Sequence, residues 1–534
     1  MRRAGLALLS ALLCCGCAQV REISGGPKDE EGPILEKASP PSGTVRFAGD
    51  RFVMLFDERV QVNRPKGGLL VSPPMDPPPT ISVSGAREVT VSWKNELRPN
   101  TTYSFAIGEA VQDLSERNPA RGLTYALSTG DAVDSLSVTG TVTHAFSGAP
   151  VEDALVMAYD AQDTSSFTKG RPMFVTRTSK GGQFALTYLP LPGLRIAALK
   201  DLNGNYRFDL PAEEIAFSPA VITPVGRNDS LAEETSLHLF QEASTTQRIL
   251  SAEVLEDRAL RIALALPAER LDLRDVAREG GRLSWSSEWN SMRDTVLLWP
   301  SDTTALSEGR FEARTEAATL DTLRYRAIKP MPFALKVKPQ PGPATGRMLR
   351  LRASRPLSEL RAEAIRLQVD SVDMAFTAMK DPNDARGVLI EALDAIPPKA
   401  MLTVLPKALR DIYGGAPDTL RLAVGPAPES AFGILRVTLI ADDDIGPCIL
   451  ELLDQGGRIV RRALGVRNGT RVDWERLEPG NHTIRLIVDT NGDGRWNPGR
   501  WSLQQQPERV FLHSEPTNVR AGWDLGISWD LRSR

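Results

Sequence analysis

The sequence predicts an all-β protein built from tandem β-sandwiches. Apolar and polar residues alternate at period two in the stretches RFVMLFDERV (51–60), TISVSGAREVTVSW (80–93) and TTYSFAIG (101–108), a pattern typical of half-buried strands. Turn residues recur about every 8–12 residues between such stretches, as they do in sandwiches. Helical periodicity is scarce, and its clearest window, LSELRAEAIRL (357–367), predicts one short helix.

Length and charge limit the classes of protein that fit. At 534 residues the chain is too long for one hydrophobic core, and at roughly 100–150 residues per domain it predicts about four or five domains. The formal net charge of −3 provides no basic field for a nucleic acid, which is therefore not expected as a partner.

The N-terminus predicts export and membrane anchoring. MRRAGLALLSALLCCGC (1–17) begins with two arginines after Met1, continues with an apolar run and ends in small residues and cysteine. This is the order of a secretory signal peptide, too short for a permanent membrane span. It resembles a bacterial lipoprotein signal, which implies cleavage before a lipid-modified cysteine and attachment to the membrane through the lipid. Cys17 is the best candidate because Gly16 precedes it, Cys15 is the alternative, and secretion with soluble release is a third outcome.

A polar tether, residues 18–32, is expected to separate the anchor from the first domain. Its acidic run Asp29–Glu30–Glu31 is either a sorting signal for surface display or simply solvated.

The chain repeats two kinds of segment. SVTGTVTHAFSGAPVEDALVMAYD (137–160) with GGQFALTYLPLPGLRIAALKDLNGNYRFD (181–209) has the same pattern as GILRVTLIADDDIGPCILELLD (433–454) with RVDWERLEPGNHTIRLIVDTNGDGRWN (471–497). Independently, KALRDIYGGAPDTLRLAVG (407–425) echoes EAVQDLSERNPA and LTYALSTG within 109–130. A pair of different sandwiches is therefore expected to recur at the C-terminus.

Two segments resemble known families. Residues 33–130, through PPSGTVRFAGDRFVMLFDERV, NTTYSFAIGEAVQDLSERNPA and ALSTGD, resemble the bacterial Ig-like domain first described in S-layer proteins. Residues 137–225, through GTVTHAFSGAPVEDALVMAYD and KDLNGNYRFD, resemble transthyretin-like or carboxypeptidase-regulatory sandwiches. With the signal and GGPKDEEGP, the order resembles a family of Gram-negative envelope lipoproteins of unassigned activity. The resemblance implies tandem Ig-like and transthyretin-like β-sandwiches in the cell envelope, on an outer-membrane lipoprotein that faces the periplasm or the surface.

The expected boundaries follow from these similarities and from the turn pattern. They are 1–17 for the signal peptide, 18–32 for the tether, 33–132 for the Ig-like domain, 133–245 for the transthyretin-like sandwich, 246–345 for a further β-sandwich, 346–430 for a second Ig-like sandwich and 431–534 for a second transthyretin-like sandwich.

No constellation of residues predicts an enzyme. The histidines lie far apart, without metal-ligand spacing, and no HExxH, GxSxG or P-loop motif occurs. The acidic pairs Glu213–Glu214 and Asp443–Asp444 are expected to be solvated rather than to carry acid–base chemistry. A non-catalytic structural, adhesion or binding scaffold follows, with an envelope protein or a glycan as its partner.

Apolar residues near the C-terminus leave two interpretations open. Trp474, Trp496, Trp501, Trp523 and Trp529 fall within the last 61 residues, and an exposed row would stack on sugars, as in a glycan-binding surface lipoprotein. Burial of Trp474 and Trp529 in a core is the favoured interpretation. Trp523 and Trp529, six residues apart, are expected on one face of a strand if the segment is regular. Cys448, in the apolar run GPCILELL, is also expected in the core.

DTNGDGRWN (489–497) and DLNGNYRFD (201–209) are two candidate calcium loops. Each follows a strand, which excludes an EF-hand, and the twelfth position is Arg500 or Ala212, neither of which is a bidentate carboxylate. Weak calcium binding, at about 10⁻⁴–10⁻³ M, is the only cofactor expectation, and a metal-free Asx-turn hairpin is the favoured alternative. The candidate oxygen donors are Asp489, Asn491, Asp493 and Asn497 in one loop and Asp201, Asn203, Asn205 and Asp209 in the other.

Overall fold

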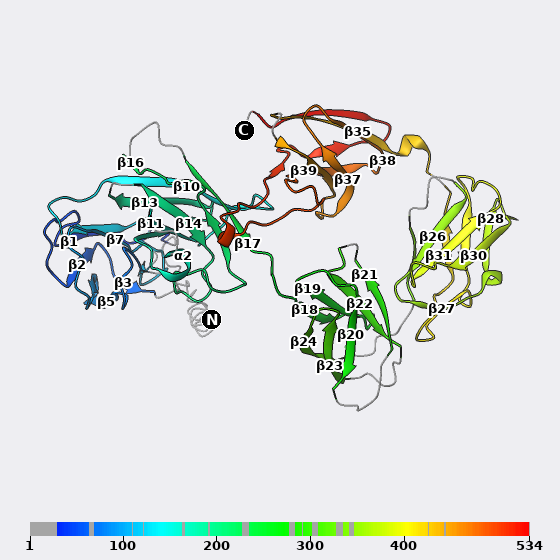
Figure 1. Cartoon of the computed structure of the whole chain (residues 1–534), viewed down its shortest axis with the longest axis horizontal. Helices are drawn as coiled ribbons and strands as arrows, with labels where there is room; N and C mark the ends of the chain where they lie inside the picture. The colour runs from blue at the N-terminus through cyan, green and yellow to red at the C-terminus, as the bar shows by residue number, and fades with distance from the viewer. Residues whose placement is uncertain are drawn as a thin grey trace, which may run out of the picture. The chain divides into compact units, whose positions relative to one another are not determined.

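The computed structural model describes residues 29–532 apart from short internal segments (Figure 1). The segments left out are 64–68, 109, 121, 163–165, 191–192, 227–233, 277–283, 291, 302–307, 327–334, 341–345, 426 and 443–444. Cys17, Cys15 and most of the tether therefore lie outside the described residues, as do Asp443 and Asp444. The described chain is almost entirely β and forms tandem β-sandwiches, which confirms the predicted fold class.

The chain divides into two compact units. The first holds residues up to His144 together with Ala149–Leu239, and the second holds Ala145–Gly148 together with Phe240–Arg534. No helix within the described residues is long and apolar enough to cross a membrane.

In the first sandwich, which belongs to the first unit, the sheet β1-β2-β6-β5 packs against the sheet β4-β7-β9. Strand β3 pairs with β8 beside them. Period-two alternation places Phe52, Met54 and Phe105 at zero exposure in its core, and Phe52 stacks on Tyr125 with ring centres 3.8 Å apart. Its strands are β1 (Leu35–Ser39), β2 (Arg51–Phe56), β3 (Val60–Val62), β4 (Leu70–Ser72), β5 (Thr80–Ser84), β6 (Glu88–Ser92), β7 (Thr102–Ala106), β8 (Val111–Asp113) and β9 (Thr124–Ser128).

The second sandwich joins its strands along one path, β12-β11-β14-β15-β17-β10-β13, with β16 on β10. Strand β17 runs parallel to β10, whereas β13 and β16 pair with β10 antiparallel. Its elements are β10 (Leu136–His144), β11 (Leu155–Asp160), α2 (Ser166–Lys169), β12 (Phe174–Arg177), β13 (Gln183–Leu189), β14 (Leu194–Leu199), β15 (Glu214–Phe217), β16 (Val225–Gly226) and β17 (Thr235–Gln241).

The third sandwich belongs to the second unit and pairs the sheet β18-β19-β22-β21 with the sheet β20-β23-β24 around one core. The ring of Trp285 meets the rings of Phe311 and Tyr325 edge-on in that core. Its strands are β18 (Ile249–Val254), β19 (Leu260–Leu264), β20 (Leu271–Asp275), β21 (Trp285–Trp289), β22 (Thr295–Pro300), β23 (Glu308–Thr315) and β24 (Thr319–Arg326).

The fourth sandwich repeats the strand order of the first. Its sheets β25-β26-β31-β30, β27-β33 and β28-β32-β34 correspond to β1-β2-β6-β5, β3-β8 and β4-β7-β9, with β29 added beside β28. Its elements are β25 (Val337–Gln340), β26 (Met348–Ala353), β27 (Leu357–Leu360), η1 (Ala362–Ala364), β28 (Ile365–Val369), β29 (Val372–Asp373), β30 (Phe376–Lys380), β31 (Gly387–Ala392), β32 (Met401–Val404), β33 (Leu409–Asp411) and β34 (Leu420–Ala423).

The fifth sandwich repeats the second, since β35 pairs antiparallel with β38 and parallel with β42, as β10 does with β13 and β17. Strands β36, β37, β39 and β40 correspond to β11, β12, β14 and β15. Its elements, after the short η2 (Glu429–Ala431), are β35 (Gly433–Ile440), β36 (Cys448–Leu453), β37 (Ile459–Val466), β38 (Arg471–Leu477), β39 (Gly480–Val488), η4 (Trp501–Leu503), β40 (Val510–Leu512), β41 (Thr517–Val519) and β42 (Asp524–Asp530).

The helix expected over 357–367 does not form, and that expectation was wrong. The window splits into β27, the single turn η1 and the start of β28. Leu357 and Leu360 pair with β33, and Ile365 and Leu367 point into the core from another sheet. The apolar spacing therefore reflects two strands on either side of a corner, where packing outweighed helix propensity.

The first and fourth sandwiches share a buried aspartate at the end of equivalent strands, β8 and β33. Asp113 in the first accepts the N–H groups of Glu116, Arg117 and Asn118 at 2.6–2.9 Å. Burial alone would raise the pKa of Asp113, but these donors hold it below its usual value. Each aspartate therefore fixes the turn that follows it.

In the fourth sandwich the corresponding Asp411 accepts the N–H groups of Tyr413 and Gly415 and also meets a buried cation. Arg355 Nε lies 3.1 Å from Asp411 Oδ2, and the two side chains are 2% and 0% exposed. Because Val60 pairs with Asp113 and Leu357 with Asp411, Glu58 occupies in the first sandwich the place of Arg355. Burial and the nearby Asp113 raise the pKa of Glu58. Asp411 thus has a buried arginine as its partner, whereas a glutamate takes that arginine's place beside Asp113.

Replacing Arg355 by methionine should therefore destabilise the fourth sandwich. The change leaves the Asp411 carboxylate buried without its cation, which costs about 3–5 kcal/mol. Hydrogen exchange of the β32 amides, measured on the full chain in increasing denaturant, reports the free energy of opening. Arg361→Met is the matched control, since Arg361 pairs with Glu359 at the surface, and equal effects of the two changes would contradict the prediction.

Candidate functional site

The loop 489–497 begins the connection between the antiparallel strands β39 and β40. Asp489, 4% exposed, accepts the N–H groups of Asp493 and Gly494 at 3.1 and 2.9 Å. Asn491 accepts from the N–H of Asp493 and Asp493 from that of Arg495, each two residues ahead. These are the hydrogen bonds of consecutive Asx turns, and Gly492 and Gly494 adopt the positive φ that such turns need.

The loop 201–209 is built in the same way between the antiparallel strands β14 and β15. Asp201 accepts the N–H groups of Gly204 and Tyr206, at 2.7 and 2.9 Å. Asn203 and Asn205 each accept from the N–H two residues ahead. Asp201 and Asp489 thus occupy equivalent places in the second and fifth sandwiches.

The carboxylate oxygens that should bind a cation largely accept hydrogen bonds from asparagine side chains of the same loop. In the loop 201–209, Asn203 Nδ2 and Asn205 Nδ2 donate to the carboxylate of Asp209 at 3.1 and 2.7 Å. In the loop 489–497, Asn491 Nδ2 and Asn497 Nδ2 donate to Asp493 at 3.2 and 3.0 Å. Burial alone would raise the pKa of Asp493, but the hydrogen bonds from Asn497, Arg495 and Asn491 lower it. The amide nitrogens would have to leave before a cation could take these oxygens.

Each loop is closed by a buried glutamate that the sequence analysis missed. Glu508, 6% exposed, accepts the N–H and hydroxyl of Thr490 at 2.7 Å and the N–H of Asn497 at 2.9 Å. Glu213, with no exposure, accepts the N–H groups of Leu202, Asp209 and Leu210 at 3.0–3.1 Å. The expectation that Glu213 is solvated was wrong, because loop N–H groups that lack a strand partner need a buried acceptor.

The carboxylates therefore stabilise the loops through backbone hydrogen bonds. Among the residues the structure describes, no three or more histidine, cysteine, aspartate or glutamate side chains gather around a point that could hold a metal ion. Asp489 and Asp493 remain the acidic side chains that a cation would meet in the 489–497 loop. The signal that could have identified Glu213 is its place next to Ala212, at the point where the loop returns to β15.

The C-terminal tryptophans do not form an exposed row. Trp474 and Trp529 are 6% and 3% exposed in the core of the fifth sandwich, as favoured, and Cys448 is fully buried there. Trp496 is half-buried, donates from Nε1 to the carbonyl of Glu508, and lies against Phe146, which groups with the second unit. Trp523 is 60% exposed.

The placement of Trp523 and Trp529 on one strand face was wrong. Trp523 precedes β42, which begins at Asp524, and lies in the turn that starts this strand. The guanidinium of Arg520 covers its ring at 5.0 Å. The even spacing of the two residues has no meaning here, because Trp523 does not share the regular pleat.

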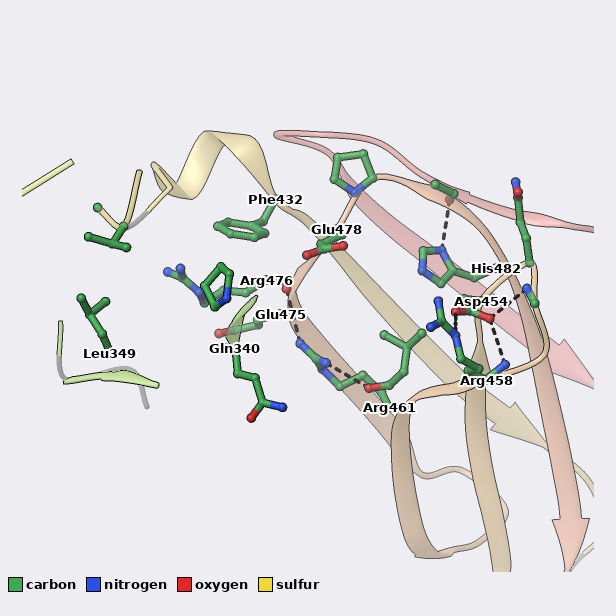
Figure 2. Close-up of a pocket in the computed structure, with 18 of the residues that line it drawn as sticks. Gln340, Leu349, Phe432, Asp454, Arg458, Arg461, Glu475, Arg476, Glu478 and His482 are labelled. Atoms are coloured by element: carbon green, nitrogen blue, oxygen red, sulfur yellow. Dashed lines mark hydrogen bonds and ion pairs between the residues drawn. The ribbon is translucent and has the colours of Figure 1, made fainter. Parts of the chain in front are cut away.

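A cavity of about 1190 Å³ in the second unit is lined by residues of the fourth and fifth sandwiches. Figure 2 shows its charged side, where Arg458 bonds to Asp454 at 2.7 Å and Arg461 reaches backbone carbonyls at 3.0–3.4 Å. His482 Nδ1 lies 3.0 Å from the carbonyl oxygen of Gly480. The described lining residues include no serine, threonine or cysteine beside this histidine.

Comparisons with known proteins bear on the first sandwich. Residues 29–129 match the bacterial Ig-like domain family, which confirms the resemblance predicted for 33–130. No curated protein matches the chain.

The solved structures that match the chain do so at very low identity. The TIE protein of Bacillus anthracis is 8% identical over 95% of this chain and 76% of its own, with a TM-score of 0.16. The major pilin subunit BcpA of Bacillus cereus is 10% identical over 74% of this chain and 99% of its own, with a TM-score of 0.14. Domains 1–6 of the surface layer protein SbsC are 10% identical over 91% and 67%, also at 0.14. Scores of this size carry no statement about shared function.

Removing Glu508, the glutamate that closes the loop 489–497, should open that loop. Glu508→Ala leaves the N–H groups of Thr490 and Asn497 without their acceptor, and each buried unsatisfied group costs about 1–3 kcal/mol. Hydrogen exchange of these two amides should accelerate, while the β36 amides keep their protection. Glu515→Ala, at an exposed position nearby, is the control, and unchanged exchange in Glu508→Ala would contradict the assignment.

Calcium should bind the loops weakly at most. Both loops lack a free bidentate carboxylate, and the amides of their asparagines already occupy the acidic oxygens, so no affinity tighter than about 10⁻⁴ M is expected. Calorimetric titration of the full chain with calcium measures this directly. Micromolar binding that disappears in Asp489→Ala would overturn the prediction.

Proposed function

We propose that the chain is a lipid-anchored, non-catalytic scaffold of the cell envelope, with a structural or adhesive role. The observation that carries the proposal is the repeated pair of β-sandwiches behind a lipoprotein-like signal. The first sandwich matches the bacterial Ig-like domain, and its strand order recurs in the fourth. Such modules serve mostly as spacers and binding surfaces, although a fold alone does not determine a function.

The use of the acidic side chains supports a non-catalytic role. Four buried carboxylates accept hydrogen bonds from the backbone N–H groups of turns and loops: Asp113, Asp411, Glu213 and Glu508. A catalytic carboxylate instead faces a substrate pocket with a pKa matched to proton transfer. These residues therefore serve the fold.

Membrane attachment in the proposal rests on the N-terminal sequence. Cleavage before Cys17 would leave a lipidated cysteine followed by a short polar tether and the first sandwich. We place the protein in the outer membrane, facing the periplasm or the cell surface, with an envelope protein or a glycan as its partner.

The glycan-binding alternative now depends on Trp523. Its exposed ring, lying against Arg520, has the amphipathic character that sugars stack on. Trp474 and Trp529 belong to the core, and Trp496 and Trp501 are half-buried. Of the five tryptophans, Trp523 is therefore the exposed one, and the scaffold is the better supported function.

Replacing Cys17 by serine should abolish lipid labelling and release the chain from membranes. Metabolic labelling with a radioactive fatty acid and fractionation of cells measure both effects. Cys15→Ser is the matched control and should retain the label. Labelling that survives in Cys17→Ser but not in Cys15→Ser would move the cleavage site, and an unlabelled unmutated chain would overturn the anchor.

A further inference from the structure

The outer face of the sheet β4-β7-β9 in the first sandwich is an internal interface. Ser72, Thr102, Ala126 and Ser128 point away from the core, yet they are 5%, 1%, 1% and 1% exposed. The N–H of Val175, on β12 of the second sandwich, donates to Ser72 Oγ at 3.0 Å. Small side chains on this face let the second sandwich pack against it within the first unit.

The same face of the fourth sandwich carries arginines and is open. Ser72, Ser104 and Ala126 form one row across β4, β7 and β9. The corresponding row across β28, β32 and β34 is Arg366, Thr403 and Arg421, since Ala126 in YALSTG matches Arg421 in LRLAVG. Both arginines are exposed.

The fifth sandwich carries a cation at the position that meets this face in the first unit. Val175 pairs with Met157, which pairs with Ala197, four residues before Asp201. By the same path Arg462 pairs with Glu451, which pairs with Arg485, four residues before Asp489. Arg462 therefore stands where Val175 stands.

The contact between Ser72 and Val175 thus corresponds to a pair of guanidinium groups, Arg366 and Arg462. Packing the fifth sandwich on the fourth in the manner of the first unit would bring these two long cationic side chains together. This is unfavourable, because Glu451, the carboxylate that pairs with Arg462 at 3.1 Å, is already shared with Arg485 and is not available to Arg366. The repeat has preserved the sheet but changed its outer face.

We propose that the outer face of β28, β32 and β34 is a docking surface for a protein partner rich in carboxylates. Within the described part of the chain, neither Arg366 nor Arg421 forms an ion pair or a side-chain hydrogen bond. The neighbouring acid, Asp373, accepts from Gln368 Nε2 at 2.8 Å. Two available planar guanidinium groups on either side of Thr403 suit bidentate pairing with carboxylates.

The shape of the surface favours a protein over a small ligand. It is the face of a regular sheet, and Met401, 40% exposed, adds an apolar side chain in the next row. Flat contact areas with arginine and exposed methionine are typical of protein interfaces. The inference deepens the scaffold function and rests on it, but it is independent of the lipid anchor.

The test is a titration of the full chain with a fluorescent twelve-residue peptide of alternating glutamate and serine at low salt. This peptide should bind in a salt-sensitive manner, and its glutamine counterpart should not. The double variant Arg366→Glu with Arg421→Glu should weaken binding by at least about tenfold, because each reversal turns attraction into repulsion. Arg366→Ser with Arg421→Ala, which installs the residues of the first sandwich, should weaken it as well with the fold intact.

Arg324→Glu is the matched control, since Arg324 is exposed on the sheet face of β24 in the third sandwich. Its binding should stay within about twofold of the unmutated chain. Failure of the glutamate peptide to bind, or equal weakening by Arg324→Glu, overturns the proposal. Binding of dextran sulfate without binding of the peptide also overturns it, in favour of an anionic glycan. Lipid labelling at Cys17 is a separate readout, so the two proposals fail separately.

Discussion

Hydrogen bonds from backbone N–H groups to buried carboxylates determine how the loops of this chain are formed. A sandwich satisfies the N–H groups of its strands by pairing, but every crossing between sheets leaves several without a partner. Asp113 and Asp411 accept these groups in the first and fourth sandwiches, and Glu213 and Glu508 do so in the second and fifth. A charged acceptor makes a stronger hydrogen bond than a neutral one, which compensates for the burial of the charge.

This constraint also explains why acid-rich loops in this chain do not amount to a reactive site. A carboxylate held by two or three N–H groups keeps its charge and has few lone pairs left for a proton, a substrate or a metal. The loops 201–209 and 489–497 look like cation sites in sequence because an Asx turn and a calcium loop both place short oxygen donors at alternate positions. In an Asx turn these oxygens accept hydrogen bonds from backbone N–H groups, whereas in a calcium loop they point at the bound cation.

The fold was predictable from local patterns, whereas the partners of individual side chains were not. Period-two alternation in 51–60 and 80–93 identifies β2, β5 and β6 because one face of each is buried. The window 357–367 misled because apolar residues on two strands around a corner imitate helical spacing. Glu213 was missed because its role depends on donors at Leu202 and Asp209, which sequence places several residues away. The burial of Cys448 was predicted correctly because it lies within an apolar run that forms a core strand.

The two copies of the sandwich pair show which part of a module is free to change. The inward residues must fill a core, so Tyr103 is replaced by another large apolar residue, Leu402, on the corresponding strand. The size and charge of the outward residues are limited only by whatever packs against that face. Ser72 lies beneath a neighbouring sandwich and is small, while its counterpart Arg366 is exposed and charged. Repetition of the strand order therefore does not repeat the interface, because an arginine in place of a serine prevents the close approach of a second sandwich and adds a charge to the face.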